Sequence, residues 1–508
     1  MRFAPAAWDE AAARDCPDEH ALRVLTSRWL GRDESLTLYG GGNTSIKAPW
    51  PAPGGGFVPG LFVKGSGADL ADVTERDFTP IRLDAAVRLL CGPDLDNDAL
   101  MAALEPLKLD ATAPRPSIET LLHASLPAPF VEHTHADTAL ALIDTDRGES
   151  ITRSVYGEFA AWVPFRHSGF ELARACADVF AQGATPATRA LLLANHGVVA
   201  FGDTARESFG NMLEIVRRAE AYLRERNAWT LPRAPAPVRT ARGAVALARL
   251  RHALSRAAGF VPVLCVDDAP ETVAFVQRDD LDAVAREGPP TPQHAVFTKR
   301  HPALGLDVDA YVRDYRSYGR EAGQAFPPEA LPDPAPRVLL DPAFGMIAMS
   351  VDGRHARMTA RVYAHDIAII ARASAHDRYR SLPADAVLAA EVHYGGFDRK
   401  RLARRAVDLP LLGSVIGIAA ASVPALRAAL EGAGADVAPI DGDADALRAA
   451  YAFGGLDAFL GTGASPPPLA ESLLDHAPRG ARVIDARGQS AQAIVDTLGA
   501  AWATGEIR

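Results

Sequence analysis

The chain has 508 residues, a length that predicts about three domains and excludes a single small module. Hydrophobic residues make up 48% of the sequence and charged residues 23%, the balance of a folded globular protein rather than of a disordered one. The net charge is −10, with 53 basic against 63 acidic residues and no block of one sign. We therefore expect no nucleic-acid partner.

The cysteines and the hydropathy of the chain bear on its compartment. Four cysteines lie far apart without a C-x-x-C pair, which is typical of reduced thiols in a cytoplasm and argues against a thiolate zinc site. No run reaches the roughly 18 apolar residues that cross a bilayer, and residues 1–10 lack the apolar core of a signal peptide. We therefore expect a cytoplasmic protein with no membrane partner.

The N-terminal part mixes helical and strand periods, which predicts an α/β fold. Helices are expected at 8–30, 117–126 and 204–226, and strands at 57–64, 130–135 and 190–195. The last of these helices carries the clearest signals, because Thr204 and Glu207 form a capping box ahead of an apolar stripe at three- and four-residue spacing. We expect this helix to close the first domain.

Two Pro-rich stretches, 231–238 and 326–337, are too dense in proline for a helix or a central strand and are interpreted as linkers or long loops. The middle region also has an α/β pattern. Strands are expected at 261–266, 338–340 and 346–351, and a long helix at 356–375. His301 and three tyrosines of this region are assigned to packing rather than to a pocket.

From residue 414 onward, strand-like and helix-like segments alternate to the end of the chain, which predicts a small Rossmann-like parallel sheet. Its first glycines, Gly413 and Gly417, lack the G-x-G-x-x-G spacing of a pyrophosphate-binding turn. We therefore expect no NAD site and no cofactor-binding residues there. The predicted domains are 1–235, 236–409 and 410–508.

Three histidines carry the strongest chemical signal. His133 and His135 lie at i and i+2 on a predicted strand, so both side chains point to one face and can bind one metal ion. His196 follows a buried strand, and the adjacent Gly197 permits a tight turn that exposes the ring. Three neutral imidazoles suit Zn²⁺ and leave a fourth position open for a substrate, as in catalytic sites.

Other polar groups lie upstream of these histidines. Glu119 falls in the first turn of a short predicted helix beginning near Ser117, where backbone N–H groups favour an anion. The alternative for Glu119 is a capping carboxylate that forms a surface pair with His123. Two small-residue turns, 40–45 and 64–67, have the bare backbone that can hold a phosphate.

These motifs, taken together and in order, resemble the class II aldolase and adducin N-terminal family. The matching segments are GGGNTSIK (40–47), VKGSGADL (63–70), RPSIETLLHASLP (115–127), EHTHAD (132–137) and NHGVVAFG (195–202). The sequence resembles especially the long bacterial branch in which an aldolase domain is fused to a short-chain dehydrogenase, as in bifunctional rhamnulose-1-phosphate aldolase/alcohol dehydrogenase. The resemblance continues through FTKRHPALG (297–305) to about residue 400. It implies an α/β/α first domain.

The resemblance implies a mechanism. Zn²⁺, or another divalent metal, on His133, His135 and His196 chelates a ketose phosphate and stabilises the enediolate formed when the sugar is cleaved. Glu119 is the implied general acid/base. The residues that match the family's phosphate-binding positions are Asn43, Ser66, Gly67 and Ser117. Lys64 is a candidate for an additional positive contact.

The sequence departs from the family at one position. A Pro-Tyr pair is expected before the 166–169 loop, but the chain has Pro164 and Phe165, and a phenyl ring cannot donate a proton. Either Arg166 or His167 takes over the role of proton donor, or the reaction differs from aldol cleavage. The same metal site then serves decarboxylation, epimerisation or dehydration.

Two further alternatives remain open at this point. One is a non-catalytic adducin-like module, which is expected to have lost metal ligands that this chain keeps. The other is a working dehydrogenase fusion that binds NAD. We expect the dehydrogenase part to be truncated and inactive, because only the degenerate turn at 460–464 resembles one and no Tyr-x-x-x-Lys pair follows it. The resemblance further implies a homo-oligomer, as tetramers are common in the family, and a small sugar phosphate as the partner.

Overall fold

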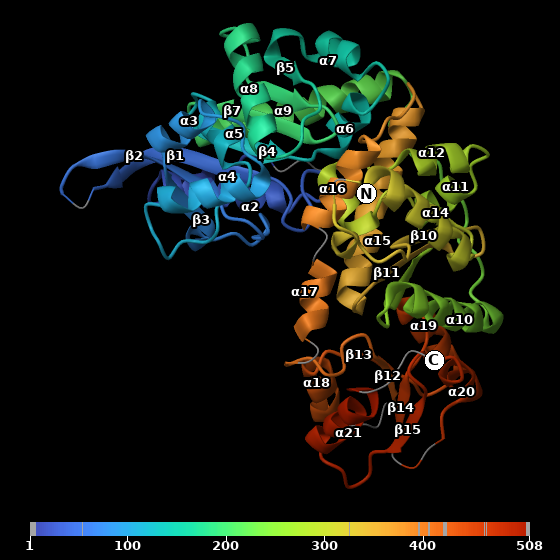
Figure 1. Cartoon of the computed structure of the whole chain (residues 1–508). Helices are drawn as coiled ribbons and strands as arrows, with labels where there is room; N and C mark the ends of the chain where they lie inside the picture. Colours follow the sequence, from blue (N-terminus) through green and yellow to red (C-terminus); the bar gives the residue numbers. More distant parts are fainter. Residues whose placement is uncertain are drawn as a thin grey trace. The chain divides into compact units, whose positions relative to one another are not determined.

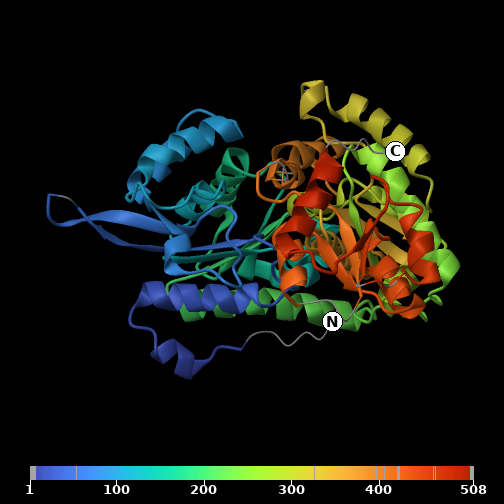
Figure 2. The same ribbon diagram turned by 90° about the horizontal axis from the view of Figure 1, so that it is seen from below.

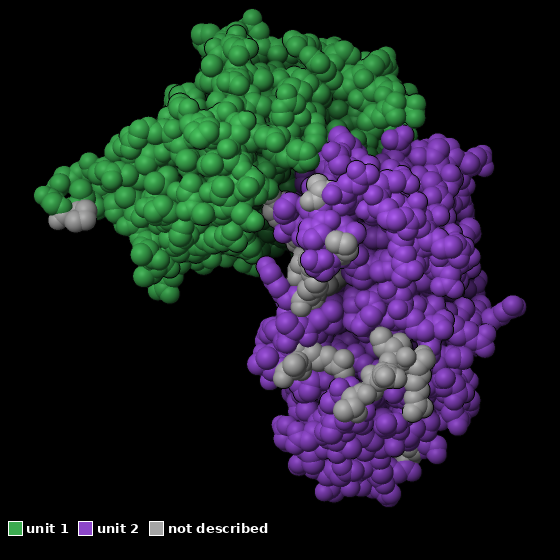
Figure 3. Space-filling model, in the orientation of Figure 1, with its two compact units in different colours: residues 1–231, 368–381 green, residues 232–367, 382–508 purple. Residues whose placement is uncertain are grey.

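A computed structural model describes the chain except for residues 1–6, 53, 325, 395–396, 405–406, 420–423, 462, 464 and 504–508. The chain folds into two compact units (Figure 3), one of residues 1–231 and 368–381 and the other of residues 232–367 and 382–508. The domain boundaries predicted at 235 and 409 stay a prediction.

The first unit is built around one mixed sheet (Figure 1), which in its described part has seven strands in the order β3-β2-β1-β4-β7-β6-β5. All neighbouring strands are antiparallel except β5 and β6. The strands are β1 (Asn43–Pro51), β2 (Phe57–Lys64), β3 (Phe78–Arg82), β4 (Phe130–Thr134), β5 (Ala160–Val163), β6 (Ala190–Leu193) and β7 (Gly197–Gly202).

Helices pack on both faces of this sheet. The helices of the unit are α1 (Glu10–Arg14), α2 (Glu19–Gly31), α3 (Leu83–Leu90), α4 (Asn97–Leu104), α5 (Thr120–Ser125), α6 (Asp137–Ile143), α7 (Gly148–Tyr156), α8 (Phe170–Gly183) and α9 (Ala205–Glu225). Short 3-10 turns are η1 (Glu75–Asp77), η2 (Glu105–Leu107) and η3 (Gly157–Phe159). Figure 2 shows α2 and α9 on the same side of the sheet, where they contact one another.

The alternation of side chains along the strands creates a core on each face. Leu192 of β6 packs with residues of α6, α7 and α9, whereas its neighbours Leu191 and Leu193 pack with residues of α3, α5 and α8. Successive side chains of a strand point to opposite faces, so a short apolar run such as β6 serves both cores. The predicted α/β/α first domain is confirmed.

The second unit contains two sheets, each of four strands in its described part. The first has the order β8-β11-β10-β9, in which only β9 and β10 are parallel, and the second, β13-β12-β14-β15, is wholly parallel. The strands are β8 (Val263–Asp267), β9 (Ala303–Leu304), β10 (Val338–Asp341), β11 (Gly345–Ser350), β12 (Val415–Ile418), β13 (Asp436–Pro439), β14 (Ala458–Gly461) and β15 (Arg482–Asp485). The small C-terminal parallel sheet is therefore confirmed.

The helices that follow α9 along the chain are α10 (Ala241–Ala258), α11 (Pro270–Val276), α12 (Leu281–Glu287), α13 (Pro292–Thr298), α14 (Val308–Ala322), α15 (Gly353–Ser374), α16 (Ala384–Tyr394), α17 (Phe397–Ala403), α18 (Pro424–Gly432), α19 (Asp443–Phe453), α20 (Pro468–Leu474) and α21 (Ala491–Ala503), with a 3-10 turn η4 (Pro328–Ala330). The last turns of α15 belong to the first unit. No helix of the described ranges is both long and apolar enough to cross a bilayer.

A buried ion pair joins the middle region to the C-terminal sheet within the second unit. Arg251 of α10 donates to both carboxylate oxygens of Asp457, at 2.7 and 3.1 Å, and to the carbonyl of Gly413 at 2.8 Å. The three tyrosines of α14, Tyr311, Tyr315 and Tyr318, are buried in the main hydrophobic core of the second unit. The packing role predicted for them is therefore confirmed.

Some predicted elements have different limits in the structure. The helix expected over 8–30 is divided into α1 and α2, because Pro17 lies between them and cannot continue a helix. The strand expected from residue 414 onward is present as β12, which begins at Val415. Residues 420–423, which follow β12, and residues 462 and 464 of the degenerate turn at 460–464 lie outside the described residues.

Candidate metal centre

Strand β4 and the residue that follows it bring two histidines to one face of the sheet. His133 lies on β4 between β1 and β7, and His135 comes directly after the strand. Glu132 points to the opposite face, where Arg23 donates to its carboxylate at 2.7 Å and Ser208 at 2.9 Å. The period of two therefore separates the histidines from a buried ion pair on the other side of the same strand.

His196 is presented by the tight turn between β6 and β7. Asn195 has a left-handed backbone with φ of 51°, which is uncommon for a residue other than glycine. Its backbone N–H donates to the carboxylate of Asp144 at 2.9 Å, and the N–H of His196 donates to the carbonyl of Leu193 at 3.2 Å. The predicted tight turn is therefore present, although the ring of His196 is buried.

The three imidazoles converge. The Nε2 atom of His133 lies 3.1 Å from Nε2 of His135 and 3.2 Å from Nε2 of His196, and all three residues are buried. Tetrahedral Zn²⁺ with bonds of about 2.05 Å to nitrogen separates its ligand atoms by about 3.3 Å. The two distances from His133 are therefore close to those expected around a divalent metal ion, and the three histidines form a candidate metal site.

Hydrogen bonding sets the tautomer of His133. Its Nδ1 lies 3.0 Å from the carbonyl of Val198, which can only accept, so Nδ1 carries the proton and Nε2 presents a lone pair toward the other two rings. Burial lowers the pKa of His133 to about 4, so the ring is neutral at neutral pH. Crowded nitrogen lone pairs of this kind are relieved by a bound cation.

Glu119 lies beside the histidines. Its carboxylate is 2.8 Å from Nε2 of His196 and 3.6 Å from Nε2 of His133, and it accepts a hydrogen bond of 2.6 Å from the amide of Asn43. Burial raises the pKa of Glu119, yet the neighbouring His133 and His196 and the amide of Asn43 together hold it well below its usual value. An ionised carboxylate is therefore available next to the candidate metal position.

A buried hydrogen-bond chain fixes the orientation of Asn43. The oxygen Oδ1 of Asn43 accepts from Nε2 of His123, and Nδ1 of His123 in turn lies 2.8 Å from the hydroxyl of Ser45. Burial lowers the pKa of His123 to about 3, so the ring is neutral, its one proton is on Nε2, and the hydroxyl of Ser45 donates to Nδ1. Asn43 is therefore held with its NH₂ group toward Glu119.

The role of His123 was missed by the sequence reasoning, which considered it only as a surface partner of Glu119. Both residues are buried, at 0% and 7% exposure. The available signal was the spacing of four residues between Glu119, which lies at the N-cap position of α5, and His123 within the helix, because this spacing brings two side chains to the same side of a helical turn. The part played by Ser45 had no comparable signal.

The predicted phosphate-binding residues fall into two groups. Ser117 is next to the carboxylate, since its hydroxyl accepts from the N–H of Glu119 at 3.2 Å and lies 3.4 Å from the amide of Asn43. Ser66 and Gly67 lie on an exposed turn after β2. Gly67 has φ of 87°, in the left-handed region that favours glycine. The phosphate-binding role of all four residues stays a prediction.

Lys64 is committed to the backbone rather than free to reach a ligand. Its ammonium donates to the carbonyl of Gly40 at 3.1 Å and to that of Ala68 at 2.6 Å. Burial lowers the pKa of Lys64 to about 8. The residue therefore ties together the two small-residue turns that the sequence singled out.

The loop that follows β5 carries the candidate proton donors. Arg166 and His167 are exposed; Arg166 donates to the carbonyl of Phe165 at 2.7 Å, and the rings of His167 and Phe165 are 5.6 Å apart. The next residue, Ser168, has its hydroxyl 3.4 Å from Nδ1 of His196. The loop therefore reaches the candidate site through Ser168, and a role of Arg166 or His167 in proton transfer stays a prediction.

Gly197 supports a first prediction, because the space next to it is occupied by the site. A Cβ atom added there would lie 2.4 Å from the carbonyl oxygen of Thr134 and 3.0 Å from Cε1 of His133. Gly197→Ala is expected to lower the free energy of unfolding by about 1 to 3 kcal/mol and to weaken zinc binding. Thermal unfolding and zinc titration of the purified variant test this.

The matched control is Gly210→Ala on α9, where an added Cβ meets no atom within 4 Å. Alanine has a higher helix propensity than glycine, so this change is expected to leave zinc binding unaltered and to stabilise by up to about 1 kcal/mol. Equal zinc affinity in the two variants would contradict the tight packing of β7 against the histidines.

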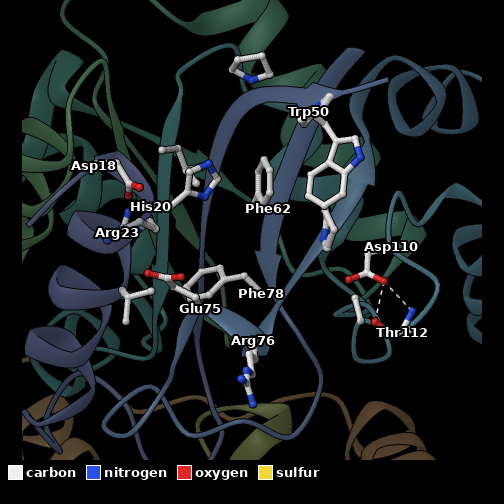
Figure 4. A pocket seen from close by; sticks show the side chains of 16 residues that line it. Asp18, His20, Arg23, Trp50, Phe62, Glu75, Arg76, Phe78, Asp110 and Thr112 are labelled. Carbon is white, nitrogen blue, oxygen red and sulfur yellow. Dashed lines mark hydrogen bonds between the residues drawn. The ribbon is translucent and has the colours of Figure 1, made fainter. Parts of the chain in front are cut away.

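A separate cavity lies over the strands β1, β2 and β3. Its volume is about 680 Å³, and aromatic rings from all three strands, Trp50, Phe62 and Phe78, line it (Figure 4). Arg23, whose guanidinium pairs with Glu132, also lines this cavity. The residues around it include neither the three histidines nor Glu119, so it is distinct from the candidate metal centre.

Comparisons with known proteins identify the family of this chain. The family profile described as "Class II Aldolase and Adducin N-terminal domain" matches residues 22–223, and the profile "Aldolase class II, second domain" matches residues 241–402. The solved N-terminal class II aldolase domain of a conserved protein from Thermoplasma acidophilum is 33% identical, and the match covers 44% of this chain and 98% of that one, with a TM-score of 0.38. The chain belongs to the class II aldolase and adducin family.

A longer relative matches about three quarters of this chain. The protein named "Uncharacterized oxidoreductase YuxG" from Bacillus subtilis (strain 168) is 28% identical over 404 residues, which are 74% of this chain and 57% of that protein. The chain thus corresponds to little more than half the length of this curated relative. The match to both aldolase profiles and to a protein named as an oxidoreductase agrees with the predicted resemblance to the long, bifunctional branch.

A solved L-fuculose-1-phosphate aldolase from Thermus thermophilus is 20% identical, and the match covers 40% of this chain and 95% of that one, with a TM-score of 0.27.

Proposed function

We propose that this chain is a metal-dependent aldehyde-lyase that cleaves a ketose phosphate or a related hydroxy-ketone, with Zn²⁺ as the expected metal. The observation that carries the proposal is the convergence of three imidazole nitrogen atoms beside one buried carboxylate. Membership of the class II aldolase family supports the same reading. A scaffold without catalytic activity has no need to keep such a donor set in a buried site.

Each protein group has a distinct part in the proposed reaction. His133, His135 and His196 would hold the metal ion, which when bound acts as a Lewis acid toward the carbonyl and adjacent hydroxyl of the substrate. Glu119 would move the proton at the reacting carbon, because its carboxylate is ionised and lies 2.8 Å from Nε2 of His196. Asn43 orients this carboxylate through a hydrogen bond of 2.6 Å.

The substrate phosphate would bind on the side of Asn43, Ser66, Gly67 and Ser117. The exposed turn at Gly67 has the bare backbone that suits an anion, whereas the N–H of Ser66 already donates to the carbonyl of Arg115 at 3.0 Å. Asn43 and Ser117 are hydrogen-bonded to each other and each to Glu119, so a phosphate bound at these two residues would lie beside the carboxylate.

A second candidate reaction is favoured by one residue. Phe165 stands where the family resemblance implies a tyrosine, and a phenyl ring can neither take the proton of the hydroxyl that becomes the aldehyde in cleavage nor return it in the reverse reaction. If Arg166 and His167 do not transfer this proton, the same metal centre would serve decarboxylation, epimerisation or dehydration of a sugar derivative. These reactions share the stabilisation of an enolate.

The test is incubation of the zinc-loaded full chain with a panel of ketose 1-phosphates and detection of the triose phosphate and aldehyde released. Cleavage of any panel member that stops on addition of a chelator supports the lyase. Bound zinc without cleavage of any panel member, but with conversion of a sugar acid or an epimer, supports the second candidate. Absence of bound metal rejects both and favours an adducin-like module.

Further parts of the proposal concern cofactors, assembly and compartment. We expect no NAD binding, a cytoplasmic location and a homo-oligomer. Phe57 at the end of the β1–β2 hairpin is 71% exposed, which gives a second copy an apolar side chain to cover. Fluorescence titration with NAD and sedimentation of the full chain test the first and the last of these expectations.

A further inference from the structure

A segment from the second aldolase region of the sequence belongs to the first compact unit. Residues 368–381 are grouped with residues 1–231, whereas the chain on either side of them belongs to the other unit (Figure 3). The profile of the second aldolase domain includes this segment, since it matches residues 241–402. The N-terminal fold is therefore completed by a part of the chain that lies far downstream.

The backbone of this segment pairs with the loop between α6 and α7. The N–H of Arg380 donates to the carbonyl of Asp144 at 2.9 Å, and the N–H of Asp146 donates to the carbonyl of Arg378 at 3.0 Å. Between these bonds, Thr145 and Tyr379 form an antiparallel bridge. The two stretches thus hold each other as in a short β-ladder.

Side chains hold both ends of the pairing. Asp377 accepts from the backbone N–H of Arg147 at 2.8 Å and from its guanidinium at 3.2 Å. His376 bonds through Nε2 to the carbonyl of Ala141 at 2.9 Å. Arg380 bonds through its guanidinium to Asp146. The downstream segment is therefore attached along residues 376–380.

This attachment extends to the turn that carries His196. Asn195 donates from its side chain to the carbonyl of Arg380 at 2.9 Å and from its backbone to the carboxylate of Asp144 at 2.9 Å. Both acceptors belong to the paired stretches. The left-handed backbone of Asn195, with φ of 51°, is held by these two bonds. The next residue in the chain is His196.

We propose that residues 376–380 and Asp144 act through Asn195 to position His196, so that the candidate metal centre of the first aldolase region depends on a segment of the second. This inference rests on the proposed function in one respect, namely that His196, which the turn carries, is a metal ligand. Asn195 and Asp377 are positioning residues. Asn195 bonds to Arg380 and Asp377 bonds to Arg147, and neither side chain is proposed to contact a reacting atom.

The deciding variant is Asn195→Gly in the full chain. Glycine adopts the left-handed backbone without strain, so the change removes the bond to Arg380 and leaves the backbone conformation allowed. Loss of one buried hydrogen bond is expected to speed amide hydrogen exchange of residues 193–197 by about tenfold in the metal-free protein. The apparent affinity for Zn²⁺, measured against a competing chelator, is expected to fall by about 10- to 100-fold.

The matched control is Asn227→Gly, because Asn227 is also left-handed, with φ of 55°, and lies in the same unit at the end of α9. This control is expected to change neither quantity. A second variant and its control test the attachment of the segment at Asp377. Asp377→Ala removes the acceptor of Arg147, whereas Glu149→Ala removes the exposed pair of Glu149 with Arg153 on α7. Only Asp377→Ala is expected to speed exchange at 193–197.

Two measurements separate the ways in which the inference can fail. Unchanged exchange at 193–197 in both Asn195→Gly and Asp377→Ala overturns the inference, whatever the protein does with metal. Faster exchange in these variants with unchanged zinc affinity overturns the positioning of a metal ligand. Faster exchange in a protein whose wild type binds no zinc supports the attachment of the turn and rejects the proposed function instead.

Discussion

Replacing Glu119 by glutamine is expected to lower the turnover number for cleavage by about 10²- to 10⁴-fold, the usual contribution of a positioned general acid or base. Glutamine keeps the size of the side chain and its hydrogen bonding to Asn43, but it cannot take up a proton. Because the three histidines stay in place, the zinc content of the variant is expected to match that of the wild type. Steady-state kinetics and metal analysis on the same preparation test both statements.

The control for this prediction is Glu171→Gln on α8, which replaces an exposed glutamate of the same unit. It is expected to leave both turnover and zinc content unchanged. A Glu119→Gln enzyme that keeps more than about a tenth of the wild-type turnover would assign proton transfer to another group, of which Arg166 and His167 are the first candidates. A variant that loses its zinc as well would assign Glu119 to the metal shell.

The convergence of the histidines could be predicted from sequence because it depends on short-range rules. The i, i+2 spacing of His133 and His135 needs only a strand, and β4 is formed by a run of buried residues. His196 needed one further rule, that a glycine after a buried strand permits a tight turn. The order of the motifs, which resembles that of the family, then indicated that His196 joins His133 and His135 in one site.

The supports of the site could not be predicted, because they depend on contacts between residues remote in sequence. Ser45 and His123 are brought together only by the packing of α5 against the sheet. Asp144 and Arg380, which fix the turn of Asn195, lie more than 200 residues apart and meet through main-chain hydrogen bonds. A carbonyl acceptor has no side-chain signal, so no pattern of residue types indicates it.

Alternation along strands was also read incompletely from sequence. Because β6 is apolar on both faces, the pattern predicted a buried strand at 190–195 without saying which helices cover each face, and it did not predict β7. The prediction for Glu119 shows the same limit. A carboxylate in the first turn of a short helix is usually a solvated cap, and only the fold shows that the carboxylate of Glu119 lies 2.8 Å from His196 in a buried site.

The second large effect is expected from His133→Ala, because Nε2 of His133 lies between those of His135 and His196, at 3.1 and 3.2 Å. With two imidazoles left, zinc affinity is expected to fall by at least about 10³-fold, since the removed ligand is worth several kcal/mol. Cleavage is expected to fall below detection at zinc concentrations that saturate the wild type. Adding a chelator to the wild-type chain should reproduce this loss, and adding Zn²⁺ back should reverse it.

His252→Ala is the control for this variant, because His252 lies on α10 in the other compact unit. Its zinc content and turnover should equal those of the wild type. Full zinc content in His133→Ala would show that the metal is held elsewhere, and activity that survives chelation would exclude the lyase mechanism even if metal is present. A site in which three imidazoles share one cation beside Glu119 requires that metal and turnover are lost together, in His133→Ala and not in His252→Ala. It also requires that His133→Ala regains turnover only at zinc concentrations high enough to overcome its weakened affinity for zinc.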